Sequence, residues 1–574
     1  IVRGTIVNSA EELVIQNGGL YQYNRDGGTI DDATWNDGST CEINGIGSSS
    51  SLSGANQSFY HFKWNCPSQT SETNLAGDLE TIRGNLILVS TGSGNLKMGQ
   101  TADYILTITG NWIHQNGILN LGGGSSNAYI NLYGNFTMEA GKITEYNSAS
   151  YISKITFTKS GTQTLNKTGG IFENNIDFEV LSGCTLDMGE SVIDGSLGMF
   201  SLNGGATLKT AHSGGIAASG ATGCIRTTNR YLSSAAHYHY CRNGAQASGS
   251  GLPSPLTGKL MIGSSIAASS LTLTNGSVTI SNLLLLCSSS AGNSAIASGT
   301  VTYGAMASLE YQGMSAQTTA LKEWPSSSGP FNVILNNPFG VSLNFSRTIT
   351  GNLNLIQGNF GLGSNTLQLN GTLTYGTGTL EGTCLSTLGI GGTSGVAIDI
   401  SNLTLGNLNL NRPGGIRLTG NVFICTTMVM TAGSVTQLSG NAISYQSGSR
   451  LIYNGTGAQS TAAEEFPLLS GPPSLEVDKP TGTTLNLQFS RTLAESLILK
   501  GGIFSIGPNS LTLSGTILNS GGSLLGGSAS GIQFAPGASA GALPAVQLGN
   551  LTIHRNSGVI MNGDCLICGT LTLH

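Results

Sequence analysis

The chain has 574 residues, of which 84 are glycine and 9% are charged, and its formal net charge is −6. A single compact core stops growing well below this length, so we expect several domains or an elongated repeat. An ordinary soluble domain has roughly 25% charged residues. The scarcity of charged residues in this chain, with only 23 Lys and Arg and no basic cluster, argues against nucleic acid as a partner. The 39% of hydrophobic residues suffices for a core, yet no apolar run approaches the ~20 residues of a membrane-spanning helix.

Residues 1–80 are predicted to form an N-terminal β segment that contains aromatic residues. Asp31 and Asp32 are a candidate carboxylate pair, but neighbours on a strand point to opposite faces, so they form a dyad only in a turn. Solvated corner residues are the alternative interpretation. Ten cysteines are too sparse for a disulfide scaffold. Cys41 and Cys66 can pair if adjacent coils bring them together.

Residues 81–155 are predicted to form plain coils, because a corner of Gly, Asn and an apolar residue recurs at regular spacing. It begins at Gly84, Gly110 and Gly134, at intervals of 26 and 24 residues. Gly and Asn are residues that accept turn geometry. With roughly 22–26 residues per coil, the chain would make about 22–26 coils. At ~4.8 Å per layer this gives a rod on the order of 110–125 Å long.

Residues 156–300 are predicted to form a first larger module. Its segment DMGESVIDG carries the best local carboxylate cluster, Asp187, Glu190 and Asp194. Polysaccharide cleavage needs two carboxylates a few ångströms apart, often beside a basic residue or Ca²⁺. The simpler interpretation is that these are solvated corner residues.

The same module contains AHYHYC, in which His237, His239 and Cys241 share one face of a strand at a two-residue step. Such a set can converge on a transition metal, with Cys224 as the obvious further ligand. The alternative is a partly exposed ladder of aromatic and imidazole rings with Tyr238 on the opposite face. We predict no metal here.

Residues 301–442 are predicted to form a second module, and its segment GNLNLIQGNFGLGSNTLQLNGT reveals the coil. Apolar pairs occur in it at a seven-residue step, namely Leu353 and Leu355, Phe360 and Leu362, and Leu367 and Leu369. The Gly, Asn and Ser residues between them disfavour a coiled coil. The step of two within each pair indicates a strand with one buried face. Three strands and three corners give a coil of about 21 residues, stabilised only by its neighbours.

Residues 443–574 are predicted to form a third module, because they echo the second. LEYQGMSAQTTALKEWPSSSGP, which begins at Leu309, returns as LIYNGTGAQSTAAEEFPLLSGP at Leu451, 142 residues later. FSRT (345–348) recurs at 489–492, with an offset of 144. Tyr311 and Gln317 match Tyr453 and Gln459, and with the glycine between them they form a Tyr, Gly and Gln element. YHYCRNGAQ (238–246) is a weaker copy of this element, and SGTQ (160–163) is a remnant of it.

Near the end of this module, Cys565 and Cys568 have the C-x-x-C spacing of half a zinc site. We find no second half, and the spacing of three on a strand points the thiols to opposite faces, so buried small residues are the favoured interpretation. Both chain ends, at Ile1–Val2 and at Leu571–His574, are expected to be cuts in a longer precursor or edges that stack end to end into a filament.

The segments GGLYQYNRDGGTIDDATWNDGSTCEINGI (18–46), FKWNCPSQT (62–70) and GGATLKTAHSGGI (204–216) resemble the Gly/Thr/Asn-rich repeat regions of large extracellular proteins of Bacteroidota. The resemblance implies export by the type IX secretion system, a place on or near the cell surface and, for some members, a role in attachment. It transfers no catalytic residue, because its motifs are corners, ladders and turn glycines.

We therefore predict an all-β, right-handed parallel β-helix that serves as an extracellular structural or adhesive stalk or filament. Its expected partners are copies of itself, surface glycans or other cells. We predict no enzyme activity, no cofactor, no metal and no catalytic residue. The alternative is a carbohydrate-active β-helix enzyme, a lyase or hydrolase.

Overall fold

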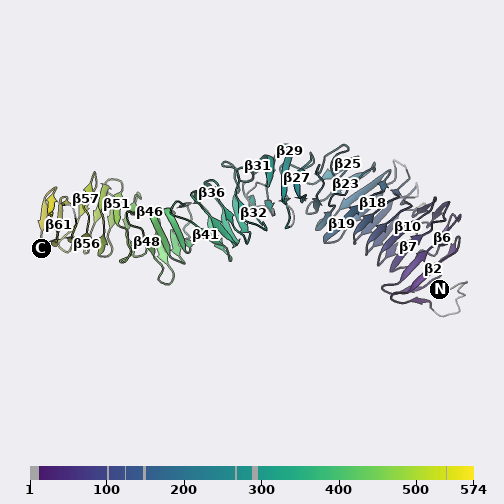
Figure 1. Cartoon of the computed structure of the whole chain (residues 1–574), viewed down its shortest axis with the longest axis horizontal. Helices are drawn as coiled ribbons and strands as arrows, with labels where there is room; N and C mark the ends of the chain where they lie inside the picture. The colour runs from purple at the N-terminus through teal and green to yellow at the C-terminus, as the bar shows by residue number, and fades with distance from the viewer. Residues whose placement is uncertain are drawn as a thin grey trace. The chain divides into compact units, whose positions relative to one another are not determined.

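The computed structural model describes residues 12–99, 102–122, 125–146, 150–265, 268–287, 295–537 and 540–574. These residues form a parallel β-solenoid of about 25 turns with about 22 residues per turn and no helix. Figure 1 shows the short strands of successive coils lying side by side. The prediction of an all-β solenoid is confirmed. The described residues divide into two compact units, unit 1 up to Ala307 and unit 2 from Ser308.

Unit 1 has three main runs of paired strands, which are the faces of its coils. The first run contains β2 (Leu20–Tyr23), β5 (Thr40–Ile43), β7 (His61–Asn65), β10 (Leu86–Ser90), β13 (Trp112–His114), β16 (Phe136–Met138), β19 (Gly161–Lys167), β22 (Cys184–Asp187), β24 (Thr207–Thr210), β26 (His237–Tyr240), β28 (Lys259–Ile262) and β30 (Leu283–Leu286). The second contains β9 (Thr81–Ile82), β12 (Tyr104–Ile108), β15 (Ala128–Leu132), β18 (Ser153–Phe157), β21 (Ile176–Val180), β23 (Met199–Leu202) and β25 (Asn229–Leu232). The third contains β8 (Glu72–Asn74), β11 (Asn95–Lys97), β14 (Ile118–Asn120), β17 (Lys142–Thr144) and β20 (Ile171–Phe172). Smaller sets are β27 (Gly244–Ala247) with β29 (Ser269–Ile280) and β31 (Ile296–Tyr303), β1 (Val14–Ile15) with β4 (Thr34–Trp35), and β3 (Gly28–Thr29) with β6 (Leu52–Ser53).

Unit 2 repeats the plan with shorter coils. Its longest run contains β36 (Arg347–Ile349), β39 (Thr366–Leu369), β42 (Thr387–Ile390), β44 (Leu403–Asn411), β46 (Val422–Ala432), β49 (Arg450–Tyr453), β51 (Ser474–Asp478), β54 (Leu497–Gly501) and β57 (Ile517–Asn519), with β48 (Ile443–Tyr445) paired to β46. Another run contains β32 (Ser308–Tyr311), β34 (Asn332–Asn336), β37 (Asn352–Gln357) and β40 (Thr372–Tyr375), which pair in that order. Two four-stranded sheets are β33 (Gln317–Thr318), β35 (Val341–Ser342), β38 (Asn359–Gly361) and β41 (Thr379–Glu381), and β50 (Gln459–Ser460), β52 (Thr484–Asn486), β55 (Ile503–Ser505) and β58 (Ser523–Leu525). The remainder are β53 (Arg491–Leu493), β56 (Ser510–Leu513), β59 (Gly531–Phe534), β62 (Asn550–Ile553) and β65 (Leu571–Leu573); β43 (Ile398–Ile400), β45 (Ile416–Leu418) and β47 (Val435–Gln437); β60 (Gly541–Leu543) with β63 (Val559–Met561); and β61 (Val546–Leu548) with β64 (Cys565–Ile567).

The seven-residue step of the second module is the length of one coil face. Leu353 lies in β37, Phe360 in β38 and Leu367 in β39, and each of these strands belongs to a different run. Leu353 is paired with Leu373 and Phe360 with Leu380, so one coil advances by 20 residues. The predicted three-strand coil of about 21 residues is confirmed.

The Gly-Asn corners of unit 1 stack directly on one another. The side-chain Oδ1 of Asn85 accepts a hydrogen bond from the backbone N–H of Asn111 at 2.8 Å, and Asn111 Oδ1 accepts one from Asn135 at 2.8 Å. A Cβ atom on Gly110 would lie 2.3 Å from the carbonyl oxygen of Gly84, which is too close for any residue with a side chain. Glycine lets the coils approach, and asparagine then bonds one corner to the next.

The 142-residue repeat is repeated in three dimensions. The carboxylates of Glu323 and Glu465 each accept a hydrogen bond from the backbone N–H three residues earlier, in both cases at 2.6 Å. Ser328 and Ser470 both adopt a left-handed backbone, with φ of 55° and 58°. The repeated segments beginning at Leu309 and Leu451 therefore fold into the same turn, which matches their interpretation as an architectural repeat. The division of the whole chain into five segments stays a prediction.

Candidate functional site

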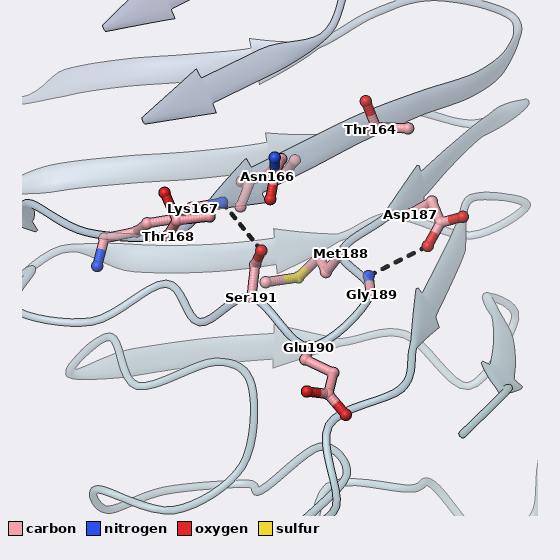
Figure 2. A pocket seen from close by; sticks show the side chains of 10 residues that line it. Thr164, Asn166, Lys167, Thr168, Asp187, Met188, Gly189, Glu190 and Ser191 are labelled. Atoms are coloured by element: carbon pink, nitrogen blue, oxygen red, sulfur yellow. Dashed lines mark hydrogen bonds between the residues drawn. The ribbon is translucent and has the colours of Figure 1, made fainter. Parts of the chain in front are cut away.

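The acidic cluster of the first module borders a shallow cavity of about 380 Å³ between residues 164–168 and 187–191. Figure 2 shows that Asp187 and Glu190 point away from each other at its rim. Asp187 Oδ1 accepts the backbone N–H of Gly189 at 3.1 Å, and Asp187 Oδ2 lies 2.7 Å from Nζ of Lys209. Asp187 is thus both a turn cap and an ion-pair partner of the next coil.

The other two carboxylates of the cluster have cationic partners of their own. Glu190 contacts Arg242 at 2.6 Å, and Asp194 contacts Lys167 at 3.0 Å. Glu190 is mostly exposed, so its pair contributes little to stability. Each carboxylate faces a cation, whereas sugar hydrolysis requires two carboxylates on opposite sides of one bond. The arrangement is that of ion pairs between coils: Asp187 pairs with the next coil, and Glu190 pairs with Arg242, which lies 52 residues later.

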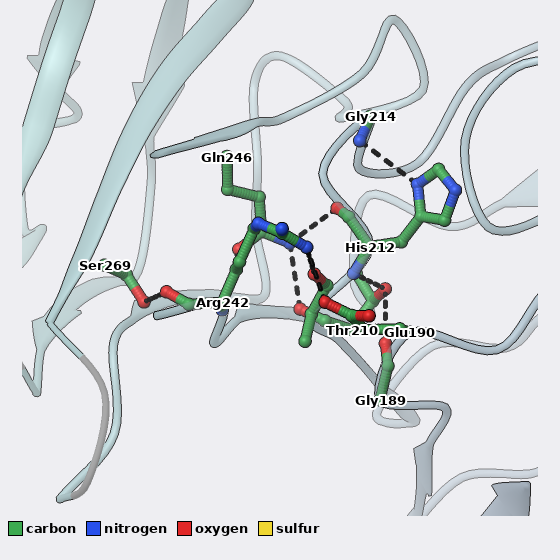
Figure 3. Close-up of polar contacts among 9 residues, drawn as sticks. Gly189, Glu190, Thr210, His212, Gly214, Arg242, Gln246 and Ser269 are labelled. Atoms are coloured by element: carbon green, nitrogen blue, oxygen red, sulfur yellow. Dashed lines mark hydrogen bonds and ion pairs between the residues drawn. The ribbon is translucent and has the colours of Figure 1, made fainter. Parts of the chain in front are cut away.

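The glutamine of the recurring Tyr, Gly and Gln element bonds its own coil to an earlier one. Figure 3 shows Gln246 between the backbone of Arg242 and the segment from Thr210 to His212. Gln246 Oε1 accepts the N–H of Arg242 at 3.0 Å, and its Nε2 donates to the carbonyl oxygens of Thr210 and His212 at 2.9 and 3.1 Å. With all these bonds made, the buried amide is a structural tie.

Gln163, in the remnant SGTQ, makes the corresponding contacts. Its Oε1 accepts the N–H of Lys159 at 2.9 Å, and its Nε2 donates to the carbonyl oxygens of Leu132 and Gly134 at 2.9 and 2.6 Å. The motif that sequence analysis singled out therefore has an architectural role.

The histidine ladder lies as the alternation predicts, with Tyr238 buried and the imidazoles of His237 and His239 on the other face of β26. His237 Nδ1 accepts the backbone N–H of Lys259 at 3.0 Å, and His239 Nε2 lies 2.6 Å from the carbonyl oxygen of Gly263. Burial lowers the pKa of both histidines, which favours neutral rings.

The candidate extra ligand, Cys224, is fully buried, while Cys241 is half-buried. Among the residues that the structure describes, no three His, Cys, Asp or Glu side chains are grouped as a metal site would require.

The N-terminal carboxylates Asp31 and Asp26 also accept hydrogen bonds within the protein. Asp31 and Asp32 lie outside any strand, and Asp31 Oδ2 accepts the hydroxyl of Tyr21 at 2.7 Å. Burial, reinforced by this bond to Asp31, raises the pKa of Tyr21. Sequence analysis missed Asp26, whose carboxylate accepts the N–H groups of residues 47–49; these bonds lower its pKa to about 2.

The cysteine pairing differs from the one considered from the sequence. Cys41 and Cys66 are buried thiols, because the residue paired with Cys41 on the next coil is Phe62. Burial raises the pKa of Cys66 to about 11, so it is protonated at neutral pH. Cys384 and Cys425 form a disulfide instead, across 41 residues. The separation of 41 residues is close to the length of two 20-residue coils in this region. A spacing of whole coils was the sequence signal that these two cysteines could lie close together.

Cys565 and Cys568 at the C-terminal coils are both free thiols. Cys565 lies in β64 and is half-buried, while Cys568 follows the strand and is exposed. Nε2 of Gln547 lies 3.2 Å from the sulfur of Cys568. The interpretation as buried small residues is therefore wrong for Cys568, whose thiol is exposed.

The least expected titratable group is Glu465, which is 1% exposed. Its Oε1 accepts the hydroxyl of Tyr453 at 2.7 Å and the N–H of Ala462 at 2.6 Å, while Oε2 has no hydrogen-bond partner. Burial raises the pKa of this carboxyl group. Nothing in the local sequence pattern marks this carboxylate as buried.

No protein-family model, no curated protein and no solved structure matches the chain. In the described part of the chain, no helix has the length and apolarity needed to cross a membrane. The fold is therefore established by the coils themselves.

Proposed function

We propose that this protein is a non-catalytic extracellular stalk that projects from a bacterial surface and adheres through many weak contacts. The observation that carries the proposal is the outer surface of the coils in unit 2. Its strands present stacked, uncharged amide and hydroxyl side chains, whereas their inner faces are filled with aliphatic residues.

The outward ladder is ordered by contacts between successive coils. Thr372 Oγ1 donates to Oδ1 of Asn352 at 3.0 Å, and Thr374 Oγ1 donates to Oδ1 of Asn354 at 3.0 Å. Asn407 links two coils in the same way, since its Nδ2 donates to Thr387 at 3.1 Å. These exposed groups are held in place at the ~4.8 Å spacing of strands. Ordered groups lose less entropy when they bind sugars or a second copy of the ladder.

Two further features support an extracellular location. The disulfide between Cys384 and Cys425 is a bond that persists in oxidising compartments. The resemblance of residues 18–46 to Bacteroidota surface repeats points the same way, and with it we propose type IX export. Many weak contacts along one ladder would add up through effective concentration, either with surface glycans or in a filament of copies of this chain.

Solution scattering and adhesion together test the proposal. About 25 coils at ~4.8 Å per layer correspond to ~120 Å of stacked length, and a straight stack of that length has a radius of gyration of about 35 Å. A compact chain of 574 residues would give about 25 Å. Beads densely coated with the protein should bind glycan-coated or cell surfaces, and sparsely coated beads should bind far less. A compact radius, or binding that does not depend on density, contradicts the stalk.

Lack of catalysis is tested separately. The protein is incubated with a panel of neutral and acidic polysaccharides, and new reducing ends and unsaturated uronate products are measured. We expect neither. Sustained product formation would instead favour a carbohydrate-active enzyme.

A further inference from the structure

Unit 2 contains a half-open cavity of about 330 Å³ beside the outward ladder, and its walls are both polar and apolar. It lies where β40 and β41 meet the coils of β43 and β45, and its polar lining includes Tyr375, Thr377, Thr379, Asp399, Ser401 and Thr419. Its volume is at the small end of the ~300–1,000 Å³ range of ligand sites. A cavity of this size suits one small ring.

The threonines of the cavity have already used their hydroxyl protons within the protein. Thr377 Oγ1 donates to the carbonyl oxygen of Ile356 at 3.2 Å, and Thr419 Oγ1 donates to that of Ile400 at 3.2 Å. A hydroxyl oxygen that donates its proton still has lone pairs to accept with. The cavity therefore offers acceptors to a ligand that carries several donors.

Two other groups define the charge and the orientation of such a ligand. Asp399 is held by a two-point contact with Arg417, Nε to Oδ1 at 2.7 Å and Nη2 to Oδ2 at 2.6 Å, so the carboxylate is neutralised locally. The hydroxyl of Tyr375 is buried and has no hydrogen-bond partner. A buried hydroxyl without a partner costs about 1–3 kcal/mol, which a bound hydroxyl would recover.

The third module shows that the fold does not require these groups. With the offset of 144 residues, Asn519 stands in place of Tyr375 and Gly521 in place of Thr377. The strands around both positions are kept, as β40 and β57. Tyr375 and Thr377 are thus side chains that the coil does not need for its fold, because the second module has them and the third module does not.

We propose that this cavity binds a single neutral pyranose residue of a glycan. Ring hydroxyls would donate to the threonine oxygens and to Asp399, and one would accept from Tyr375. This inference rests on the proposed adhesive function and names the ligand class for one point along the ladder.

The test uses the full chain and the methyl glycosides of glucose, galactose, mannose and N-acetylglucosamine, measured by saturation-transfer NMR and calorimetry. We expect at least one to bind saturably. Tyr375→Phe keeps the ring and removes the hydroxyl, and it should weaken binding about two- to tenfold, the value of one hydrogen bond. Thr377→Val should weaken it similarly. Tyr133→Phe, at an exposed tyrosine of unit 1, is the matched control and should bind as the unchanged protein does.

Two outcomes overturn the proposal: no glycoside binds saturably, or the two cavity variants bind as tightly as the control. Thermal unfolding of each variant shows that it is folded. The bead assay distinguishes failure of this inference from failure of the proposed function. If the unchanged protein adheres but its cavity binds no glycoside, only the inference about the cavity is wrong. Loss of adhesion in the unchanged protein removes the proposed function.

Discussion

The asparagine corners offer the sharpest test of how the coils are held together. In Asn85→Ala the backbone N–H of Asn111 loses its acceptor, a 2.8 Å bond in a half-buried place. An orphaned buried donor costs about 1–3 kcal/mol, and partial exposure places this one at about 1–2 kcal/mol. Asn135→Ala orphans the N–H of Thr164 at an exposed corner, where water replaces the bond, so it should cost less than ~0.5 kcal/mol.

Hydrogen exchange read by mass spectrometry on peptides covering residues 108–116 measures this cost locally. Since 1.4 kcal/mol is a factor of ten, Asn85→Ala should speed exchange there by about 5- to 30-fold. Asn85→Asp keeps an acceptor oxygen and is the matched control; it should stay within about threefold of the unchanged protein. Equal exchange in Asn85→Ala and the unchanged protein, or equal damage from Ala and Asp, would refute the role assigned to the ladder.

Three further outcomes follow from the buried and bonded groups. Glu465 has a raised pKa in the fold, so its favourable contribution is present below the unfolded value of about 4.3 and is lost as pH rises. Glu465→Gln should therefore gain stability over the unchanged protein in urea unfolding as pH rises above ~4.5, with Glu464→Gln as control; a pH-independent difference contradicts this. Asp26 has a lowered pKa, so its bonds to residues 47–49 are present above ~4 and are lost as pH falls towards 2, which should raise hydrogen exchange of that segment only in this range. Replacing Cys384 and Cys425 by serine should lower the stability of unit 2 by up to about 4 kcal/mol for a loop of 41 residues, and non-reducing peptide mapping that recovers both as thiols would disprove the bond.

The coil could be predicted because its signal is local and repeated. The apolar pairs beginning at Leu353, Phe360 and Leu367 each encode one strand, and their seven-residue step encodes one face. Gly110 and Asn111 mark a corner because only glycine fits at the first position and the short side chain at the second carries an acceptor oxygen to the next layer. Every copy of the pattern strengthens the same inference.

The charged groups could not be placed in this way, because their surroundings come from several coils at once. Arg412 is 1% exposed and donates to the carbonyl oxygens of Val396, Asn370 and Gly391, which lie between 16 and 42 residues away. Glu465 is buried by a turn whose path depends on packing. Neither residue is distinguished by its immediate sequence, and a solvated surface charge is the natural expectation for both.

The cavity at Tyr375 was missed for a related reason. Its lining is divided between coils, and each contribution is a threonine, serine or tyrosine of the kind found all along the chain. The comparison between the second and third modules was available in the sequence. However, the contrast of Tyr375 with Asn519 has meaning only when both are known to lie at the same corner of a coil.

The direction of the backbone hydrogen bonds has a mechanical consequence. Within each unit these bonds join one layer to the next, so a force that pulls the layers apart acts on a few bonds at a time. A detached turn of about 22 residues can extend to roughly 75 Å, against ~4.8 Å while it is stacked. Under tension each unit would lengthen stepwise, one coil after another, and would dissipate mechanical work as it lengthens.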